Sequence, residues 1–454
     1  MSLDARTHES RPIAGADDLV AWMRGKERPR EQWKVGLEHE KVLLRSGTLE
    51  GVPYEGEAGV AAVLRGFGRF GYEPFEEDGR VIASQKSGLT VSIEPGGQLE
   101  LSGRPFADVH VVAAELDRHL EKCRSIGEEL GVEFLALGYR PWGVAADGPW
   151  MPKKRYAAMR PFLAARGRLA EDMMAMTASV QASFDFSGER DLAEKLRVAL
   201  AIQPAVTALL ANSPIVDGRL SGWKSFRIAV WEETDPARCG LLEFPFEPGF
   251  DDEPYRRYAE WALDVPMIFL RRDGAYLPTG GRTFRQFLAE GMAGERPTLA
   301  DWEDHLTTVF PDVRVKGVVE VRGADSCGPA LTKALVALWK GILYDREART
   351  WAFDAVKRFS IAERRAFMVA AGREGLAGRA PDGRPIVELA RTVIDAAASG
   401  LCRQHCCGQR GHDERIWLEP LRTGAATCRS PADEALEIFE RDGPRALAAS
   451  SRCA

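Results

Sequence analysis

The chain has 454 residues, of which 45% are hydrophobic and 28% are charged, and its formal net charge is −6. A chain of this size buries enough apolar surface to fold without disulfide or metal cross-links. The acidic balance argues against binding to nucleic acids or anionic membranes, because both kinds of partner select a basic surface.

Several features bear on where the protein works. The N-terminus, MSLDARTHESRPIAG, is polar and lacks the apolar segment of a secretory signal. The most apolar long stretch, residues 198–216, is interrupted by Gln203 and Pro204, which favours a core helix and turn over a membrane span. Eight cysteines in a chain without an export signal indicate reduced thiols, and we expect a cytoplasmic protein.

The first half of the chain is predicted to mix helices and strands. Periodic and alternating patterns predict a helix over residues 16–25, a strand over 35–44, a helix over 58–67, a hairpin over 81–101, a helix over 108–130 and a strand over 134–137. The hairpin is expected to turn at Pro95-Gly96-Gly97, because these residue types favour tight turns.

The second half becomes helical toward its end. The patterns predict a strand over residues 179–186, a helix over 191–210, a helix over 299–310 that ends before Pro311, a strand over 313–321, and only helices beyond about residue 344. Because no regular βαβ rhythm is visible, we predict an α+β fold with a largely antiparallel sheet. We divide the chain into a leader with a short helix (1–30), a core (31–345) and a mainly helical region packed on it (346–454), together one compact unit.

Five glutamates stand on predicted strands at positions that give shared faces. Glu38 and Glu40 are two residues apart in VGLEHEKVLL, so both project from the same face of a strand. Glu94 and Glu100 stand on the two arms of the predicted hairpin. Glu320 alternates with apolar residues in VKGVVEVRGADS. Each strand therefore has an apolar face and a carboxylate face.

Carboxylates gathered on one face repel each other, and burying them without partners is unfavourable. Divalent cations would resolve this repulsion, because magnesium binds oxygen ligands and shares them with substrate phosphates. Arg322 shares a strand face with Glu320 and suits a phosphoryl group in transfer. The alternative is an exposed sheet whose charged face is simply solvated, and the pattern alone leaves both interpretations open.

Other polar residues are candidates for binding substrates. Gln181 shares a strand face with Ser183 and Asp185, which fits an inward-facing binding surface and fits solvent exposure equally well. The basic run at residues 153–155 could clamp a carboxylate or a phosphate. Arg227 lies among apolar residues in SFRIAVWEE, which favours an anion ligand over an ordinary surface arginine.

Two further patterns are assigned no chemistry. The segment GFGRFG (66–71) matches a dinucleotide-binding fingerprint but follows a predicted helix, whereas the fingerprint must follow a strand. The second pattern is a group of possible zinc ligands, Cys402, His405, Cys406, Cys407 and His412. No second cysteine pair stands at zinc-finger spacing, so we favour a solvated helix end over a zinc site for this group.

Taken in chain order, these segments resemble the plant-type glutamate–cysteine ligases (γ-glutamylcysteine synthetases), and we expect a bacterial member of that family. The resemblance runs from about residue 33 to 344 and continues more weakly to about 440. It rests on VGLEHEKV, SIEPGGQLELSG, MPKKRY, DMMAMTASVQASFDFS, LANSPIVDG, AVWEETDPARCG, EWALDVPM, TFRQFLAEG, DWEDHLTTVFPDVR and EVRGADS. It implies a core related to glutamine synthetase, in which an antiparallel sheet forms a funnel with helices packed outside.

The resemblance also implies roles for individual residues. It implies two or three magnesium ions held by Glu38, Glu40, Glu94, Glu100 and Glu320. Arg322 would meet the γ-phosphate of ATP, and Gln181 would contact metal or substrate. Arg227, Lys153 and Arg155 would hold substrate carboxylates.

The implied reaction joins glutamate to cysteine. The γ-carboxylate of glutamate takes the γ-phosphoryl group of ATP, and the amine of cysteine then displaces phosphate, giving γ-glutamylcysteine, ADP and phosphate in the first step of glutathione synthesis. The expected partners are these small molecules, with a monomer or a homodimer as the assembly. Removing one clustered carboxylate, as in Glu320→Gln, is expected to reduce activity more than stability.

One departure and several rival functions accompany this interpretation. The segment LAEGMAGERP lacks the cysteine that plant members carry nearby, so we expect no plant-like redox switch. The rivals are a ligase for a different amine in a specialised thiol or natural-product pathway, a non-catalytic relative that binds nucleotide or glutamate, and a structural protein with a charged sheet face. The presence of all five glutamates together with Arg322 favours an enzyme.

Overall fold

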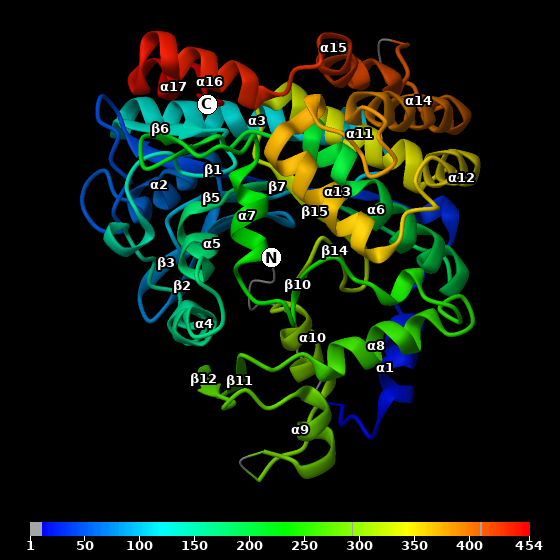
Figure 1. Cartoon of the computed structure of the whole chain (residues 1–454). Helices are drawn as coiled ribbons and strands as arrows, with labels where there is room; N and C mark the ends of the chain where they lie inside the picture. Colours follow the sequence, from blue (N-terminus) through cyan, green and yellow to red (C-terminus); the bar gives the residue numbers. More distant parts are fainter. Residues whose placement is uncertain (1–10, 293, 409–410) are drawn as a thin grey trace.

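An antiparallel sheet of nine strands lies at the centre of the part of the chain that this computed structural model describes, residues 11–292, 294–408 and 411–454 (Figure 1). The strands are hydrogen-bonded in the order β14-β15-β7-β1-β5-β4-β3-β2, with β6 also paired to β1, and the sheet does not close on itself. Their bounds are β1 (Val35–Arg45), β2 (Glu73–Glu77), β3 (Arg80–Lys86), β4 (Leu89–Ile93), β5 (Leu99–Ser102), β6 (Val132–Leu135), β7 (Ser179–Phe184), β14 (Val313–Val315) and β15 (Val319–Asp325).

Helices and three small strand pairs surround this sheet. The small pairs are β8 (Ile215–Val216) with β9 (Arg219–Leu220), β10 (Cys239–Gly240) with β13 (Phe310–Pro311), and β11 (Phe269–Arg272) with β12 (Ala275–Pro278). The helices before residue 300 are α1 (Ala16–Arg24), α2 (Val60–Gly66), α3 (Val109–Leu130), α4 (Lys154–Ala164), α5 (Ala170–Met176), α6 (Glu189–Leu209), α7 (Phe226–Glu232), α8 (Pro254–Asp264), α9 (Phe284–Glu290) and α10 (Leu299–Leu306). The later ones are α11 (Pro329–Leu343), α12 (Arg346–Asp354), α13 (Ile361–Glu374), α14 (Ile386–Gln404), α15 (Glu419–Thr427), α16 (Pro431–Asp442) and α17 (Pro444–Ser450).

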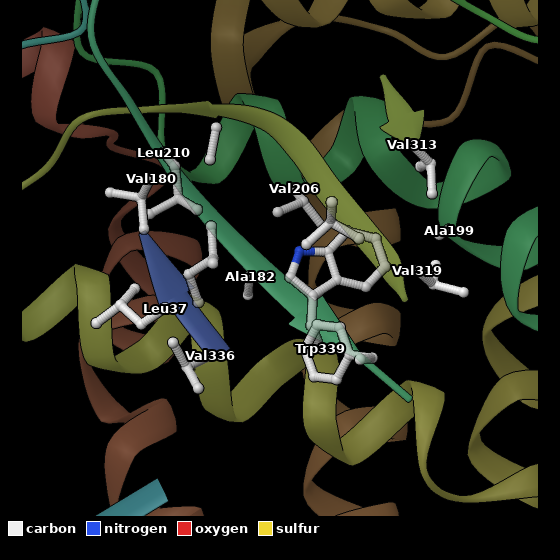
Figure 2. Packing of buried hydrophobic residues seen from close by; sticks show 14 of the residues in the cluster. Leu37, Val180, Ala182, Ala199, Val206, Leu210, Val313, Val319, Val336 and Trp339 are labelled. Atoms are coloured by element: carbon white, nitrogen blue, oxygen red, sulfur yellow. The ribbon is translucent and has the colours of Figure 1, made fainter. Parts of the chain in front are cut away.

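One face of the sheet is apolar and packs against helices. The alternation along β7 turns Val180 and Ala182 toward this face, and Leu37 does the same on β1 (Figure 2). Val336 and Trp339 of α11 lie against them, and both are fully buried. α6 also contacts β15, and α3 contacts β1 and β6, so the opposite, polar face of these central strands is left to line a site.

The C-terminal helices form an outer layer. α14 packs on α11 and α6, and α16 and α17 pack together beside α3 and β6 (Figure 1). An isolated bridge between Leu135 and Arg452 ties the end of the chain to β6. In the part of the chain that the structure describes, no helix is both long and apolar enough to cross a membrane. The boundaries at residues 30 and 345 stay a prediction.

The predicted fold class is confirmed, as are most elements of the first half of the chain. The prediction for residues 81–101 is wrong in detail, because this region contains the three strands β3, β4 and β5 rather than one hairpin. The extra turn falls at Ser87 and Gly88, whose φ values of 48° and 81° reverse the chain between β3 and β4.

The region over residues 299–321 was also predicted incorrectly. The helix ends at Leu306 rather than near Pro311, because residues 310 and 311 pair with β10 as β13. The single strand predicted over 313–321 is a hairpin of β14 and β15, with Gly317 at a φ of 76° in the connection. The helix predicted over residues 191–210 is confirmed as α6, which continues through Pro204.

The Pro95-Gly96-Gly97 turn is held tightly against α5. A Cβ atom at Gly96 would lie 2.0 Å from the carbonyl oxygen of Ala175, so only glycine fits. The side chain of Gln98 accepts a hydrogen bond from the Gly96 amide at 2.9 Å and donates to the carbonyl oxygen of Thr177 at 2.7 Å. The turn therefore fixes where the β4–β5 hairpin meets α5.

We expect Gly96→Ala to lower the free energy of unfolding by about 1–3 kcal/mol, because the added methyl group overlaps a backbone atom and forces the turn to move. Urea unfolding followed by circular dichroism measures this change. Gly68→Ala is the matched control, since a Cβ at Gly68 meets no atom within 4 Å. Equal stability of the two variants would contradict the close packing of the turn on α5.

Candidate active site

The polar face of the main sheet opens into a pocket that gathers most of the residues singled out from the sequence. Its walls come from β1, β5, β7 and the turn after β4 on one side, and from α4, α5 and α7 on the other. The cavity volume of this pocket is about 110 Å³. Among the predicted site residues, those that line it are Glu38, Glu40, Glu94, Glu100, Arg155, Gln181, Arg227 and Arg322.

The register of the central strands places the polar side chains around this pocket. Glu40 lies directly opposite Glu100 across the β1–β5 pair, and Glu38 lies opposite Gln181 across the β1–β7 pair. Glu94 directly follows the last residue of β4, which pairs with β5. Because residues that face each other in paired strands project to the same side of a sheet, the strands deliver these groups to one place.

Burial and mutual repulsion change the ionisation of these carboxylates. The pKa of Glu94 is raised to about 8, first by burial and then by the negative charge of Glu100, while the charge of Lys153 acts in the opposite direction. The pKa of Glu40 is raised to about 7, again by burial first and by Glu100 second. The backbone amide of Ser179 donates to Glu40 Oε2 at 2.6 Å. At neutral pH the metal-free pocket therefore holds protons that a divalent cation would displace.

Magnesium fits this set of donors. Among the described residues, no three Asp, Glu, His or Cys side chains already form a cluster that could hold a metal ion. Magnesium does not require such a cluster, since it commonly keeps several water ligands and uses one or two carboxylates together with substrate phosphates. The facing pair Glu40 and Glu100, with Glu38 and Glu94 on the same wall, supplies carboxylates of this kind.

Glu320 is placed differently from the other four glutamates. Its carboxylate accepts hydrogen bonds from Arg314 Nε at 2.6 Å, from Arg314 Nη2 at 3.0 Å and from Arg322 Nη1 at 3.3 Å. Arg314 stands directly opposite Glu320 across the β14–β15 pair. Burial alone would raise the pKa of Glu320, but the charges of these two arginines hold it well below its ordinary value.

Glu320 therefore belongs to a buried ion pair and not to the repulsive cluster, and it is not among the described residues that line the pocket. Breaking a buried ion pair is strongly destabilising, because the partner keeps an uncompensated charge. For this geometry we expect Glu320→Gln to reduce stability as well as activity, unlike the expectation from the sequence alone. A direct metal-binding role for Glu320 stays a prediction, and it would require Arg314 to release the carboxylate.

Arg322 reaches the pocket from a bulge in β15. The register against β7 shifts at this point, so that Arg322 and Gly323 together stand opposite Gln181. Arg322 Nη1 donates to Gln181 Oε1, and Gln181 Nε2 donates to Glu40 Oε1 at 3.2 Å. Gly323 permits the bulge, since a Cβ there would lie 2.5 Å from the side chain of Gln203. Gln181 thus links a predicted phosphate ligand to a predicted metal ligand.

Arg227 on α7 brings an unsatisfied guanidinium to the pocket. Its Nη2 donates to the backbone oxygen of Arg322 at 2.9 Å, whereas its buried Nε and Nη1 have no hydrogen-bond partner among the described residues. The start of α7 is anchored by Asp325, which accepts hydrogen bonds from the hydroxyls of Ser213 at 2.7 Å and Ser225 at 2.9 Å. Buried donors without an acceptor are unfavourable, and they suit a bound carboxylate.

Only one residue of the basic run reaches the pocket. Arg155 lines it, and its buried Nε has no hydrogen-bond partner within the described ranges. Lys153 is buried beside the pocket wall, where its Nζ donates to the carbonyl oxygen of Ile93 at 2.8 Å. Lys154 turns outward and pairs with Asp78 at 2.9 Å. A direct substrate contact is therefore proposed for Arg155, with Lys153 acting through its charge.

Part of the pocket escaped prediction. Arg314 and Lys316 add positive charge to the wall. The signal for Arg314 was present, because Gly317 permits a turn in VRVKGVVEVR that folds Arg314 back onto Glu320. An apolar wall was also missed, and it is formed by Met159, Met173, Met174, Trp231 and Phe310.

Two other predicted groups lie outside this pocket. Ser183 and Asp185 line a second pocket, although they share an alternating pattern with Gln181. The cysteine-rich stretch at residues 402–407 lies at the end of α14, where Cys406 Sγ is 3.6 Å from Lys340 Nζ. All eight cysteines are free thiols.

We expect Glu320→Gln and Glu94→Gln to affect the metal-free protein in opposite directions. Glu320→Gln leaves the charge of Arg314 buried and should lower the free energy of unfolding by about 3 kcal/mol. The pKa of Glu94 is raised in the folded state, so the folded protein binds this proton more tightly than the unfolded chain does. The wild type therefore loses stability as rising pH removes the proton. Glu94→Gln should therefore gain stability relative to the wild type between about pH 5 and pH 8.

Urea unfolding in the presence of a chelator, at pH 5, 7 and 8, measures both effects. Glu121→Gln, at an exposed position of α3, is the matched control. Similar losses of stability for both variants at pH 8 would show that the two glutamates do not differ in the way described.

Comparison with known proteins agrees with this geometry. The sequence model of Glutamate-cysteine ligase family 2 (GCS2) matches residues 34–450, so the similarity extends through the C-terminal helices. Glutamate–cysteine ligase B, chloroplastic, from Oryza sativa subsp. japonica is 37% identical over 435 residues, which cover 95% of this chain and 85% of that protein. The chloroplastic glutamate–cysteine ligase of Nicotiana tabacum is 38% identical over 428 residues, or 93% of this chain and 79% of that protein.

A solved structure shares the fold at low sequence identity. The crystal structure of glutamate–cysteine ligase from Francisella tularensis in complex with AMP has a TM-score of 0.55 and 12% identity, covering 93% of this chain and 89% of that one. The family match over most of the chain, together with the carboxylate-lined pocket, leads to one conclusion: the chain belongs to glutamate-cysteine ligase family 2.

Proposed function

We propose that this protein joins the γ-carboxylate of L-glutamate to the amine of L-cysteine in an ATP-dependent reaction, as the names of its relatives indicate for them. The observation that carries the proposal is one pocket lined by four glutamates, of which Glu100 is buried and the others are half-buried, together with arginines whose buried N–H groups have no hydrogen-bond partner among the described residues. The glutamates supply acceptors for a cation, and the arginines supply donors for the carboxylate of a substrate.

Arg227 and Arg155 hold glutamate in this proposal. Each offers at least one buried N–H without a protein acceptor, and a guanidinium matches a carboxylate in shape and charge. Asp325 fixes the start of α7 and so the direction of Arg227. Held in this way, the γ-carboxylate can be aligned with the phosphate of ATP, which removes much of the entropic barrier of a reaction between two molecules.

The phosphoryl step takes place beside Arg322. The γ-carboxylate oxygen forms a bond to the γ-phosphorus while the bond to ADP breaks, and Arg322 stabilises the charge on the transferred group. Magnesium held by Glu38, Glu40, Glu94 and Glu100 would neutralise the phosphate charges there. Glu320 and Gln181 orient Arg322, since both accept hydrogen bonds from its Nη1.

The second step forms the amide bond. The nitrogen of cysteine bonds to the acyl carbon, phosphate leaves, and the amine loses a proton. The apolar wall of Met173, Met174 and Trp231 gives a small thiol side chain a surface on which to pack. The number of magnesium ions, the cytoplasmic location and the oligomeric state stay predictions.

The reaction is tested by measuring phosphate release from ATP and magnesium with glutamate, with and without cysteine, followed by mass spectrometry of the product. Cysteine-dependent release with γ-glutamylcysteine as product is expected. Release with another amine in place of cysteine would keep the ligase mechanism and change the substrate. Absence of release with every amine tried, despite nucleotide binding, would favour a non-catalytic relative.

We expect Arg227→Met to raise the KM for glutamate about a hundredfold, because the variant loses the charged donors that meet the carboxylate. The KM for ATP should change little. Arg168→Met, at an exposed ion pair with Glu233, is the matched control and should leave both constants unchanged. A uniform loss of kcat with unchanged KM for glutamate would contradict the binding role.

A further inference from the structure

A third pocket lies between α4 and the β11–β12 hairpin, which pack against each other (Figure 1). Its cavity volume is about 710 Å³, compared with about 110 Å³ for the first pocket, which forms the candidate active site. Organic ligands of moderate size usually occupy pockets of roughly 300–1,000 Å³. The third pocket therefore has room for an organic molecule, and none of the steps proposed above uses it.

Helix α4 forms a wall of both the first and the third pocket. Its residues toward the first pocket are Arg155, Tyr156 and Met159. Its residues toward the third pocket are Lys154, Ala157, Ala158 and Pro161. Because residues three or four apart share one face of a helix, the two sets lie on different faces of α4. A molecule in the third pocket would therefore press on the helix that carries Arg155.

The wall of the third pocket is mainly apolar, and its charged groups have one sign. Apolar surface comes from both sides of the pocket, from Ala157, Ala158, Pro161, Phe162, Ile268 and Tyr276. Among the described residues that line it, the charged side chains are those of Lys154 and Arg166, and both are cations. Such a wall suits a ligand that has an apolar body and one anionic group.

Arg166 brings a positive charge that its protein partner does not fully balance. Its Nε lies 3.6 Å from Asp235 Oδ2, and the same oxygen already accepts a hydrogen bond from Arg238 Nε at 2.7 Å. The guanidinium lies over the ring of Phe162, with its Cζ 3.6 Å from the ring centre. A Cβ at Gly281 would lie 3.0 Å from Arg166 Nη2, so this donor reaches the pocket wall at Gly281. One carboxylate serves two guanidiniums, which leaves charge for an anion.

Lys154 offers a second cation to the same ligand. Its ion pair with Asp78, at 2.9 Å, is exposed to solvent on both sides. Exposed pairs of this kind contribute little to stability, so Lys154 can turn from Asp78 to an anion in the pocket at small cost.

A series of side-chain contacts connects the third pocket to the first. The ring of Tyr276 packs edge-on against that of Phe269, with the ring centres 4.7 Å apart. The guanidinium of Arg155 lies over the other ring of this pair, with its Cζ 5.9 Å from the centre of Phe269. Arg155 Nη2 also donates to the hydroxyl of Thr307 at 3.2 Å. A ligand that bridges α4 and the hairpin would therefore restrict the motion of Arg155, which lies between them.

We propose that the third pocket binds a small organic anion, an aromatic or branched aliphatic carboxylate, with its apolar body between α4 and β12 and its carboxylate on Arg166. The bound anion holds Arg155 in place, so that this anion and glutamate favour each other's binding. The binding site goes beyond the proposed ligase reaction and does not depend on it. Its effect on glutamate does rest on the proposed function, in which Arg155 contacts the substrate carboxylate.

The first test uses 8-anilinonaphthalene-1-sulfonate, a fluorescent probe that joins aromatic rings to one anionic group. N-phenyl-1-naphthylamine has the same rings without the sulfonate. The wild type should bind the anionic probe about tenfold more tightly than the neutral one, because the sulfonate accepts hydrogen bonds from Arg166. In Arg166→Gln this preference should fall to less than about threefold. Arg168→Gln, at an exposed ion pair with Glu233, is the matched control.

A steric test uses Ala157→Trp, which adds a large side chain at an exposed position of the pocket wall and leaves the core untouched. Binding of the anionic probe should weaken by about tenfold or more, because the indole occupies the space of the probe. Ala164→Trp is the control for added bulk, since Ala164 is exposed on the same helix and is not among the described residues that line the pocket. Thermal unfolding of each variant verifies that the protein is folded.

The binding measurements need no substrate, so they distinguish failure of this site from failure of the ligase proposal. Probe affinity that depends on both Arg166 and Ala157 supports the site even if no γ-glutamylcysteine forms. Equal affinity for the two probes in the wild type, or unchanged affinity for the anionic probe in folded Arg166→Gln and Ala157→Trp, overturns it even if ligation proceeds.

Steady-state kinetics tests the effect on glutamate. At saturating anionic probe, the KM for glutamate of the wild type should fall by about fivefold, whereas that of Ala157→Trp should not respond. A probe bound in the first pocket would compete with glutamate and raise this KM, which would overturn the proposed site. An unchanged KM with the third pocket occupied would overturn the coupling between the two pockets.

Discussion

Repulsion among the carboxylates gathered in the first pocket is the constraint on which the rest of the site depends. Glu38 and Glu40 on β1 meet Glu100 on β5 because the antiparallel register brings them together, and gathering like charges does not stabilise a fold. The protein compensates only in part, with Lys153 buried nearby and Gln181 donating to Glu40. The remaining negative charge is left for a cation and its bound substrate to neutralise.

The buried charges of the site divide into two kinds with different consequences. The pair of Arg314 and Glu320 is complete, so it can act as a rigid support that aims Arg322. Glu94, in contrast, accepts a long hydrogen bond of 3.4 Å from the hydroxyl of Tyr156 and has a raised pKa, and Arg227 has buried N–H groups without a hydrogen-bond partner among the described residues. A cation that displaces the proton of Glu94, together with a carboxylate substrate that accepts hydrogen bonds from Arg227, would satisfy both groups. The unfavourable burial of these groups in the ligand-free protein is thus relieved when a cation and a substrate bind, and this relief favours binding.

The sequence predicted much of this arrangement, and its failures have physical causes. The alternation around Glu38, Glu40 and Gln181 is a local property of a strand, so the shared face was visible without the fold. The pairing of Arg314 with Glu320 depends on a turn at Gly317 inside what looked like one strand. Ser183 lies on the same face of β7 as Gln181 but lines the second pocket together with Asp185. Lys154 pairs with Asp78 while Arg155 lines the first pocket. Tertiary packing sets these differences, and no local pattern records them.

The position of β1 explains why such a charged site can be held in place. β1 pairs with β7 and β5 on its two edges and, further along the strand, with β6, and its apolar neighbours pack on α3 and α11. A slip of one residue would exchange Glu38 and Glu40 for Leu37 and His39, burying carboxylates in the apolar layer. The penalty for that exchange fixes the register, and the register fixes which side chains face the first pocket. The charges that destabilise the pocket therefore also select the one alignment in which they face it.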